Sequence, residues 1–155
     1  MSDERSFRVF KINNGTVIDH ILSPMAIKII DILGIKNHGG IVSIGMNFPS
    51  KLIGKKDIIK IENVYLDKKH TDIIALLAPN ATINIIKDGK VVEKRRMSPP
   101  DLIESIIKCP NPKCVTNNYH DCPTKFTMQE MKGKTTNVKC FYCERETTVF
   151  PEMFS

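Results

Sequence analysis

The sequence predicts an α+β protein: a mainly antiparallel sheet with two helices on one face, a ferredoxin-like sandwich, followed by a small antiparallel β domain. Two observations predict it. Up to residue 96, apolar segments follow the order strand, helix, two strands, helix, two strands. Beyond residue 97 this pattern changes, and all five cysteines of the chain occur there.

The first elements follow from apolar spacing and turn residues. Residues 7–12 predict a short strand, and Asn13-Asn14-Gly15 predicts a turn before residues 16–18 continue extended. Ser23-Pro24 predicts a helix start, with serine capping free amides and proline at the first helical position. Gly34 is a natural stop for that helix.

The remaining elements of the first half are predicted in the same way. Residues 41–46 and 58–64 suit strands, and Asp67 is suited to cap a second helix that ends before Pro79. Residues 81–86 and 90–94 predict two strands around the turn Asp88-Gly89.

A change in composition near residue 97 predicts a domain boundary. The segment Met97-Ser98-Pro99-Pro100 follows three basic residues, and adjacent prolines resist both helix and central strand. We therefore expect one domain over residues 1–97 and a second over residues 101–155.

The cysteines of the second domain form two short pairs. Cys109 and Cys114 stand in a C-x4-C pattern, and Cys140 and Cys143 stand in a C-x2-C pattern. Two such knuckles can place four thiolates around one zinc ion, and a closed sphere of four thiolates indicates a structural role. An iron centre fits the same ligands, whereas disulfides or a redox C-x2-C explain the four cysteines less well. Cys122 has no partner in this pattern and is expected to be a free thiol or a packed small residue.

The totals restrict the class of protein further. Of 155 residues, 41% are hydrophobic and 26% charged, as in ordinary globular domains. No apolar run reaches the roughly 18 residues of a membrane span, and no secretory signal is apparent, so we expect a cytoplasmic location. The net charge of +6 lies wholly in residues 1–100, because residues 101–155 carry seven basic and seven acidic residues. A basic first domain favours anionic partners, although surplus surface lysine explains the charge equally well.

Motifs of catalysis and phosphate binding are absent from the sequence. It contains neither G-x-x-x-x-G-K nor G-x-G-x-x-G, and no obvious nucleophile–base pair. Asp19, His20, Lys60 and Lys94 lie on or beside predicted strands and could meet ribose or phosphate. Composition and spacing alone therefore indicate a basic α+β domain joined to a structural zinc domain.

Several strings resemble the regulatory chain of aspartate carbamoyltransferase, and together they span nearly the whole sequence. They are residues 15–21 (GTVIDHI), 44–50 (IGMNFPS), 54–63 (GKKDIIKIEN), 78–84 (APNATIN) and 91–94 (VVEK), with Cys109-Pro110-Asn111 and the second cysteine pair. The resemblance implies a non-catalytic allosteric subunit in pyrimidine biosynthesis. Paired regulatory chains would bind CTP or ATP, with UTP acting beside CTP in some members. Their zinc domains would hold the catalytic chains.

The resemblance also implies a nucleotide site. Asp19 and Lys60 would face the ribose, and His20 and Lys94 the triphosphate. The base would be read and packed by Val9, Phe10, Ile12, Asn84, Ile86 and Val91. Lys56, Asp3 and Glu4 would belong to a second nucleotide or metal position, and Gly89 replaces a bulkier side chain beside the base.

Two other readings of the sequence remain. The first is a nucleic-acid-binding zinc-ribbon protein, which usually carries a basic stripe and stacking aromatics, unlike the neutral residues 101–155. The second is an autonomous enzyme, which a closed metal sphere does not favour.

Overall fold

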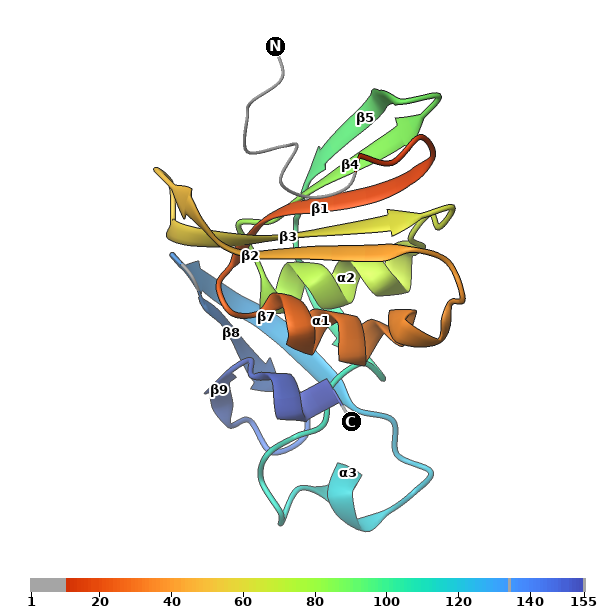
Figure 1. The fold of residues 1–155 in the computed structure, drawn as a ribbon. Helices are drawn as coiled ribbons and strands as arrows, with labels where there is room; N and C mark the ends of the chain where they lie inside the picture. The colour runs from red at the N-terminus through yellow and green to blue at the C-terminus, as the bar shows by residue number, and fades with distance from the viewer. Residues whose placement is uncertain (1–10, 134, 155) are drawn as a thin grey trace.

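The computed structural model describes residues 11–133 and 135–154, which form two antiparallel sheets (Figure 1). The predicted strand at residues 7–12 lies mostly outside this range, and Lys11 and Ile12 are not in a strand. The first sheet has the order β2-β3-β1-β4-β5. Its strands are β1 (Gly15–Leu22), β2 (Val42–Ser50), β3 (Gly54–Glu62), β4 (Thr82–Lys87) and β5 (Lys90–Arg96).

Two helices cover one face of this sheet, as the sequence predicts (Figure 1). They are α1 (Ala26–Leu33), which continues into the 3-10 turn η2 (Ile35–Asn37), and α2 (Lys68–Leu77). Alternate strand residues point toward the helices, so Ile18, Ile59 and Ile83 are fully buried in the core between the layers. The predicted α+β class and element order are confirmed.

The helix ends agree with the sequence in two places and differ in one. Asp67 caps α2 by accepting a hydrogen bond from the His70 amide at 2.9 Å, and Gly34 ends α1 with a left-handed φ of 70°. The predicted Ser23 cap is wrong, because α1 begins at Ala26 and Ser23 Oγ donates instead to Asn47 Oδ1 at 2.6 Å. The Ala26 amide donates to the buried carboxylate of Asp57, on β3, at 3.1 Å.

The turn between β4 and β5 forms at Asp88 and Gly89, as predicted. Both residues have positive φ, 52° and 76°, which suits a tight hairpin turn. The turn also contacts the start of the described chain, because the Gly89 amide donates to the Asn13 carbonyl at 2.8 Å. This contact holds the tip of the hairpin beside Asn13.

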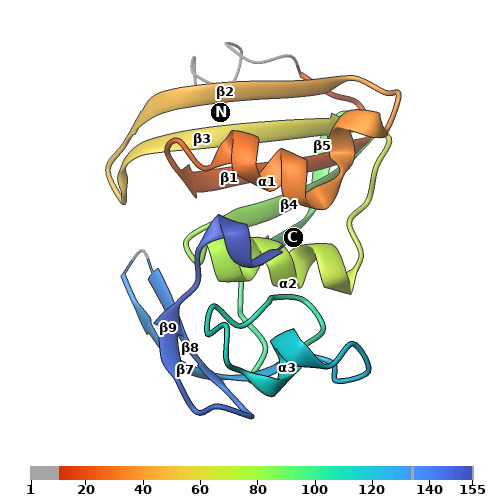
Figure 2. The same ribbon diagram turned by 90° about the horizontal axis from the view of Figure 1, so that it is seen from below.

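The second sheet has the order β6-β7-β8-β9 and is much smaller (Figure 2). Its elements are β6 (Leu102–Glu104), the short α3 (Val115–Asn118), β7 (Lys125–Lys132), β8 (Thr135–Cys140), β9 (Glu146–Thr148) and the 3-10 turn η3 (Pro151–Phe154). A small core around Ile103, Phe126 and Val138 includes the buried Cys109, Cys114 and Cys140, and the partly buried Cys143 packs against it. The predicted small antiparallel β unit is therefore present.

The two sheets contact each other through α2, which lies between them in Figure 2. Ile73, Ile74 and Leu77 of α2 pack in the first core, whereas Leu76 is buried in the second. Residues 97–101 separate β5 from β6, close to the predicted boundary, and independent folding of the two parts stays a prediction. In the described part of the chain, no helix combines the length and apolarity needed to cross a bilayer.

Candidate metal centre and basic sheet face

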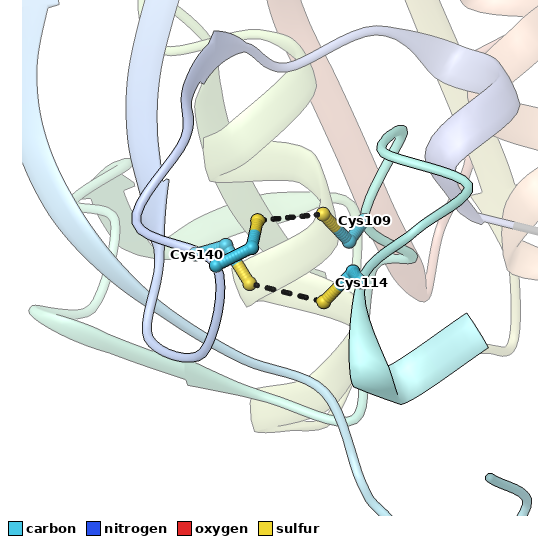
Figure 3. Close-up of side chains that lie close together, drawn as sticks. Cys109, Cys114 and Cys140 are labelled. Carbon is cyan, nitrogen blue, oxygen red and sulfur yellow. Dashed lines mark hydrogen bonds between the residues drawn. The ribbon is translucent and has the colours of Figure 1, made fainter. Parts of the chain in front are cut away.

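The four paired cysteines converge on one point between α3 and the end of β8. The Sγ atoms of Cys109, Cys114, Cys140 and Cys143 all lie within 4.8 Å of one another. Cys109 and Cys143 are 3.6 Å apart, and Cys114 and Cys140 are 3.7 Å apart, as the dashed lines of Figure 3 mark. The fold thus brings the two cysteine pairs into one cluster, although the facing cysteines are 26 and 34 positions apart in the sequence.

Local hydrogen bonds shape the first knuckle. The Asn117 side chain donates to the carbonyls of Cys109 and Asn111 at 2.9 and 2.7 Å. The Asn111 side chain in turn accepts from the Lys113 amide at 3.0 Å. In the second knuckle, the Glu144 amide donates to the Cys140 carbonyl at 3.0 Å, with Glu144 in the left-handed region. Side-chain hydrogen bonds in the first knuckle and a backbone hydrogen bond in the second therefore shape the two turns that carry the cysteines.

The spacing of the sulfurs fits a tetrahedral metal site. Four sulfurs about 2.3 Å from a zinc ion lie about 3.8 Å from each other. The Cys109–Cys143 and Cys114–Cys140 distances of 3.6 and 3.7 Å are close to this value. Burial raises the pKa of the Cys109 and Cys140 thiols. Burial also acts to raise the pKa of Cys143, but hydrogen bonds, first from the Arg145 backbone, lower it to about 7. The cluster can hold one metal ion, consistent with a structural zinc, and a bound metal would keep all four thiols ionised.

The face of the first sheet that turns away from the helices carries the predicted nucleotide residues. Strand register places Lys60, Val17, Asn84 and Lys94 side by side across β3, β1, β4 and β5. Their neighbours Ile18, Ile59 and Ile83 point into the core, so this row points the other way. Three polar residues separated by up to 34 positions thus share one row.

Asn84 holds an unusual position in this row. Its side-chain oxygen is buried and has no hydrogen-bond partner among the described residues. Lys60, in the same row, is also buried, and burial lowers its pKa, opposed by the nearby charge of Asp19. A buried acceptor without a partner is costly, so this part of the face is suited to a ligand that donates a hydrogen bond.

Asp19 and His20 lie next to the row, where β1 bulges. The Lys56 ammonium is 3.0 Å from Asp19 Oδ1 and 3.2 Å from Oδ2, and the His20 amide donates to Asp19 at 2.6 Å. The His20 ring lies 3.2 Å from the Thr82 hydroxyl, measured from Nδ1. Burial lowers the pKa of His20; Asp19 opposes this shift, while Lys56 and Lys94 add to it.

A cavity of about 460 Å³ opens beside His20 and Lys94. The sequence did not single out Arg96 and Thr82, which also line it, although Arg96 stands two residues after Lys94 and so shares its side of β5. The complete lining consists of His20, Leu52, Pro79, Asn80, Ala81, Thr82, Lys94, Arg96 and Met97. Three of these side chains are basic, so the cavity is suited to an anion.

The remaining predicted residues lie at the other end of the hairpin or outside the described range. Ile86 and Val91 face each other near the β4–β5 turn, Ile86 buried and Val91 exposed. Ile12 is buried. Val9 and Phe10 lie outside the described residues, as do Asp3 and Glu4, and Cys122 is not part of the metal cluster.

A four-cysteine cluster able to hold one metal ion, joined to a sheet with a basic cavity, defines the class of two-sheet proteins with a metal-binding part. Two family models match the chain: "Aspartate carbamoyltransferase regulatory chain, allosteric domain" over residues 7–98, and "Aspartate carbamoyltransferase regulatory chain, metal binding domain" over residues 101–149. The chain belongs to the family of aspartate carbamoyltransferase regulatory chains, and is thus a regulatory rather than a catalytic chain.

Curated relatives agree with the family models. The aspartate carbamoyltransferase regulatory chain of Pyrococcus abyssi is 47% identical over 140 residues, which are 89% of this chain and 90% of the relative. Those of Saccharolobus solfataricus and Ignicoccus hospitalis are 48% and 46% identical over 141 residues, 90% of this chain and 87% and 89% of theirs.

Proposed function

We propose that this chain is an allosteric subunit that binds CTP or ATP on the face of its first sheet that turns away from the helices, and modulates catalytic chains of aspartate carbamoyltransferase. Its zinc-binding part docks onto those chains, so that it acts in pyrimidine biosynthesis without doing chemistry itself. A nucleotide that binds one conformation of the assembly more tightly shifts the populations toward that conformation.

The observation that carries the proposal is the row Lys60–Asn84–Lys94. It places two cations on either side of a buried side-chain oxygen that lacks a partner among the described residues. A nucleotide offers the matching groups, namely anionic phosphates, ribose hydroxyls and base amino groups. Satisfying a buried acceptor favours the bound state by an amount comparable to one hydrogen bond.

The face divides into regions that suit the parts of a nucleoside triphosphate. The cavity with His20, Lys94 and Arg96 suits the phosphates. Asp19 and Lys60 lie where they suit the ribose. Ile12, Ile86 and Val91, at the turn end of the hairpin, offer apolar packing to the base, and we propose that Val9 and Phe10 complete that end. Lys56, which is paired with Asp19, is placed to contribute to a second nucleotide such as UTP.

The zinc-binding part offers a surface for the catalytic chain. Tyr119, Phe141 and Tyr142 are exposed beside the two knuckles, and the Phe141 and Tyr142 rings pack edge to face with centroids 5.4 Å apart. Aromatic residues of this kind are frequent at the centres of protein interfaces. A structural ion held by Cys109, Cys114, Cys140 and Cys143 would fix the backbone that presents them and supply rigidity rather than chemistry.

The edge strand β2 supports pairing with a second regulatory chain. Residues 42–50 contain no charged side chain, and Ile41 and Ile44 are exposed at 57% and 42%. An uncharged, apolar edge invites pairing with another strand, whereas the opposite edge, β5, is protected by lysines and arginines. A homodimer through β2 would leave both nucleotide faces open. The clustered free thiols suit a reducing, cytoplasmic location.

The nucleic-acid-binding alternative has less support. A polar hollow on the second sheet includes Glu130 and Glu146, and none of the described residues that line it is basic. A polyanion would be repelled there rather than attracted.

Calorimetry on the zinc-loaded chain tests nucleotide binding, and mixing with a catalytic trimer tests regulation. We expect titration with CTP or ATP to give a saturable heat of binding. We also expect the carbamoyltransferase activity of the mixed assembly to change when either nucleotide is added. The absence of heat with CTP, ATP and UTP would contradict the nucleotide site. Failure to form any complex with the catalytic trimer would contradict docking.

A further inference from the structure

The cavity beside His20 and Lys94 reaches from the first sheet to Met97, where the connection to the second sheet begins. Its lining includes residues 79–82, which lead from α2 into β4, together with Arg96 and Met97, where β5 ends. The Ala81 amide donates to the Ala78 carbonyl at 2.9 Å. The Met97 amide donates to the Ala81 carbonyl at 3.2 Å. Hydrogen bonds thus join the turn at residues 79–82 to Met97, the first residue after β5.

One side chain of this turn reaches the second sheet. Asn80 lines the cavity, and its Nδ2 donates to the carbonyl of Gly133, in the turn between β7 and β8, at 3.4 Å. Two residues further on, the Thr82 hydroxyl contacts the His20 ring at 3.2 Å. A group bound by His20, Lys94 and Arg96 would therefore rest against a turn that is hydrogen-bonded to the β7–β8 hairpin.

We propose that Asn80 is the positioning residue that couples the phosphate cavity to the zinc-binding sheet. The terminal phosphates of the ligand fix the turn at residues 79–82, and the Asn80 amide then holds the β7–β8 hairpin in one position. Because such coupling is reciprocal, ordering the hairpin also favours the phosphate-bound state. The proposal rests on the proposed function, since it takes the cavity as the phosphate end of the nucleotide site.

The β7–β8 hairpin leads directly to the proposed contact surface for the catalytic chain. β8 ends at Cys140, one of the four clustered cysteines, and Phe141 and Tyr142 follow directly. A change in the position of β7 and β8 would therefore reach the surface proposed to contact the catalytic chain. Position between two sites does not by itself show coupling, so the test measures coupling directly.

The test combines calorimetry with hydrogen exchange on the zinc-loaded full chain, using CTP, ATP and inorganic tripolyphosphate as probes. In the unmodified protein we expect each bound probe to slow exchange of the β7–β8 hairpin amides by about fivefold or more. Asn80→Ala should still bind the probes but lose this response, and Asn80→Gln, which keeps an amide donor, should restore it. As a matched control, Asn137→Ala removes an asparagine within the second sheet whose side chain accepts a hydrogen bond from the Thr148 hydroxyl, and should keep the response.

The outcomes separate this proposal from the proposed function. If the probes bind but the hairpin does not respond, or if Asn80→Ala responds fully, the coupling role is overturned while the nucleotide site stands. If no probe binds at all, the nucleotide site fails and the coupling proposal falls with it.

Discussion

The carboxylate of Asp57 accepts a hydrogen bond from the backbone amide of Ala26, so a residue of β3 caps the first turn of α1. The other carboxylate oxygen accepts from the Asn47 amide at 3.1 Å, and the side chain is fully buried. One buried charge therefore joins a helix start, its own strand and the bulge of β2. Helix N-termini favour negative charge, which offsets part of the cost of burying it.

Removing this carboxylate should destabilise the first sheet. Asp57→Ala leaves the buried Ala26 amide and the part-buried Asn47 amide without their carboxylate partner, and we expect the free energy of unfolding to fall by about 2 kcal/mol or more. Thermal and urea unfolding of the zinc-loaded chain measure this. Asp31→Ala is the control, because Asp31 is exposed on α1 and its carboxylate pairs with the exposed Lys36. Equal stability of the two variants would contradict the capping role.

Breaking the cysteine cluster should unfold the second sheet selectively. Cys114→Ser removes one of four metal ligands, and the small core around Phe126 cannot hold four short strands alone. We expect loss of bound metal, rapid proteolysis beyond residue 101, and exposure of Leu76 at the shared interface. Cys122→Ser, outside the cluster, should keep both metal and protease resistance. A metal-free Cys114→Ser chain that resists proteolysis as well as the unmodified protein would refute the structural role.

Losing a cation from the cavity should weaken triphosphate binding. In Lys94→Ala a charge-assisted contact is missing, so we expect CTP and ATP affinity to fall about tenfold or more in calorimetry. Arg95→Ala provides the matched control, because Arg95 pairs with the inward-facing Ile83 and thus lies on the other side of β5. The same loss in both variants would indicate a general charge effect and count against a site at Lys94.

Triphosphate binding should strengthen as the pH falls. Burial lowers the pKa of His20 from 6.5, so the free protein holds it neutral near pH 7. Bound phosphate favours the protonated ring and raises its pKa, so binding takes up a proton, and affinity increases as the pH drops toward the pKa of the free ring. Calorimetry at several pH values below 7 should show a smaller increase in triphosphate affinity with falling pH for His20→Gln than for the unmodified protein. His38→Gln should show the same increase as the unmodified protein. An identical pH slope in both variants would remove His20 from the site.

Charging the edge strand should separate the proposed homodimer. Ile44→Lys places an ammonium on the exposed apolar edge of β2, and edge lysines oppose strand pairing. Sedimentation should show dimers for the unmodified chain and monomers for this variant. Ile27→Lys alters an exposed isoleucine on α1 and should leave the dimer intact. If the Ile44→Lys chain remained dimeric, the dimer contact would not be at β2.

Much of this structure could be predicted from local sequence. The alternation of apolar residues, the turn at Asp88-Gly89, the cap at Asp67 and the stop at Gly34 each act over a few residues, and all are confirmed. The spacing of the cysteine pairs likewise predicted one cluster, since short knuckles hold their ligands by local turns. The nucleotide residues came from resemblance, and their role remains a prediction.

The sequence by itself determined which segments become helices, strands and metal knuckles, because those choices depend on neighbours along the chain. Only the tertiary structure decided that Asp57 caps a helix 31 residues away and that Leu76 faces the second core. It also placed Asn84, whose side-chain oxygen has no hydrogen-bond partner among the described residues, in one row with Lys60 and Lys94. Strand order and register bring such residues together, and no local pattern encodes which distant strand will lie alongside.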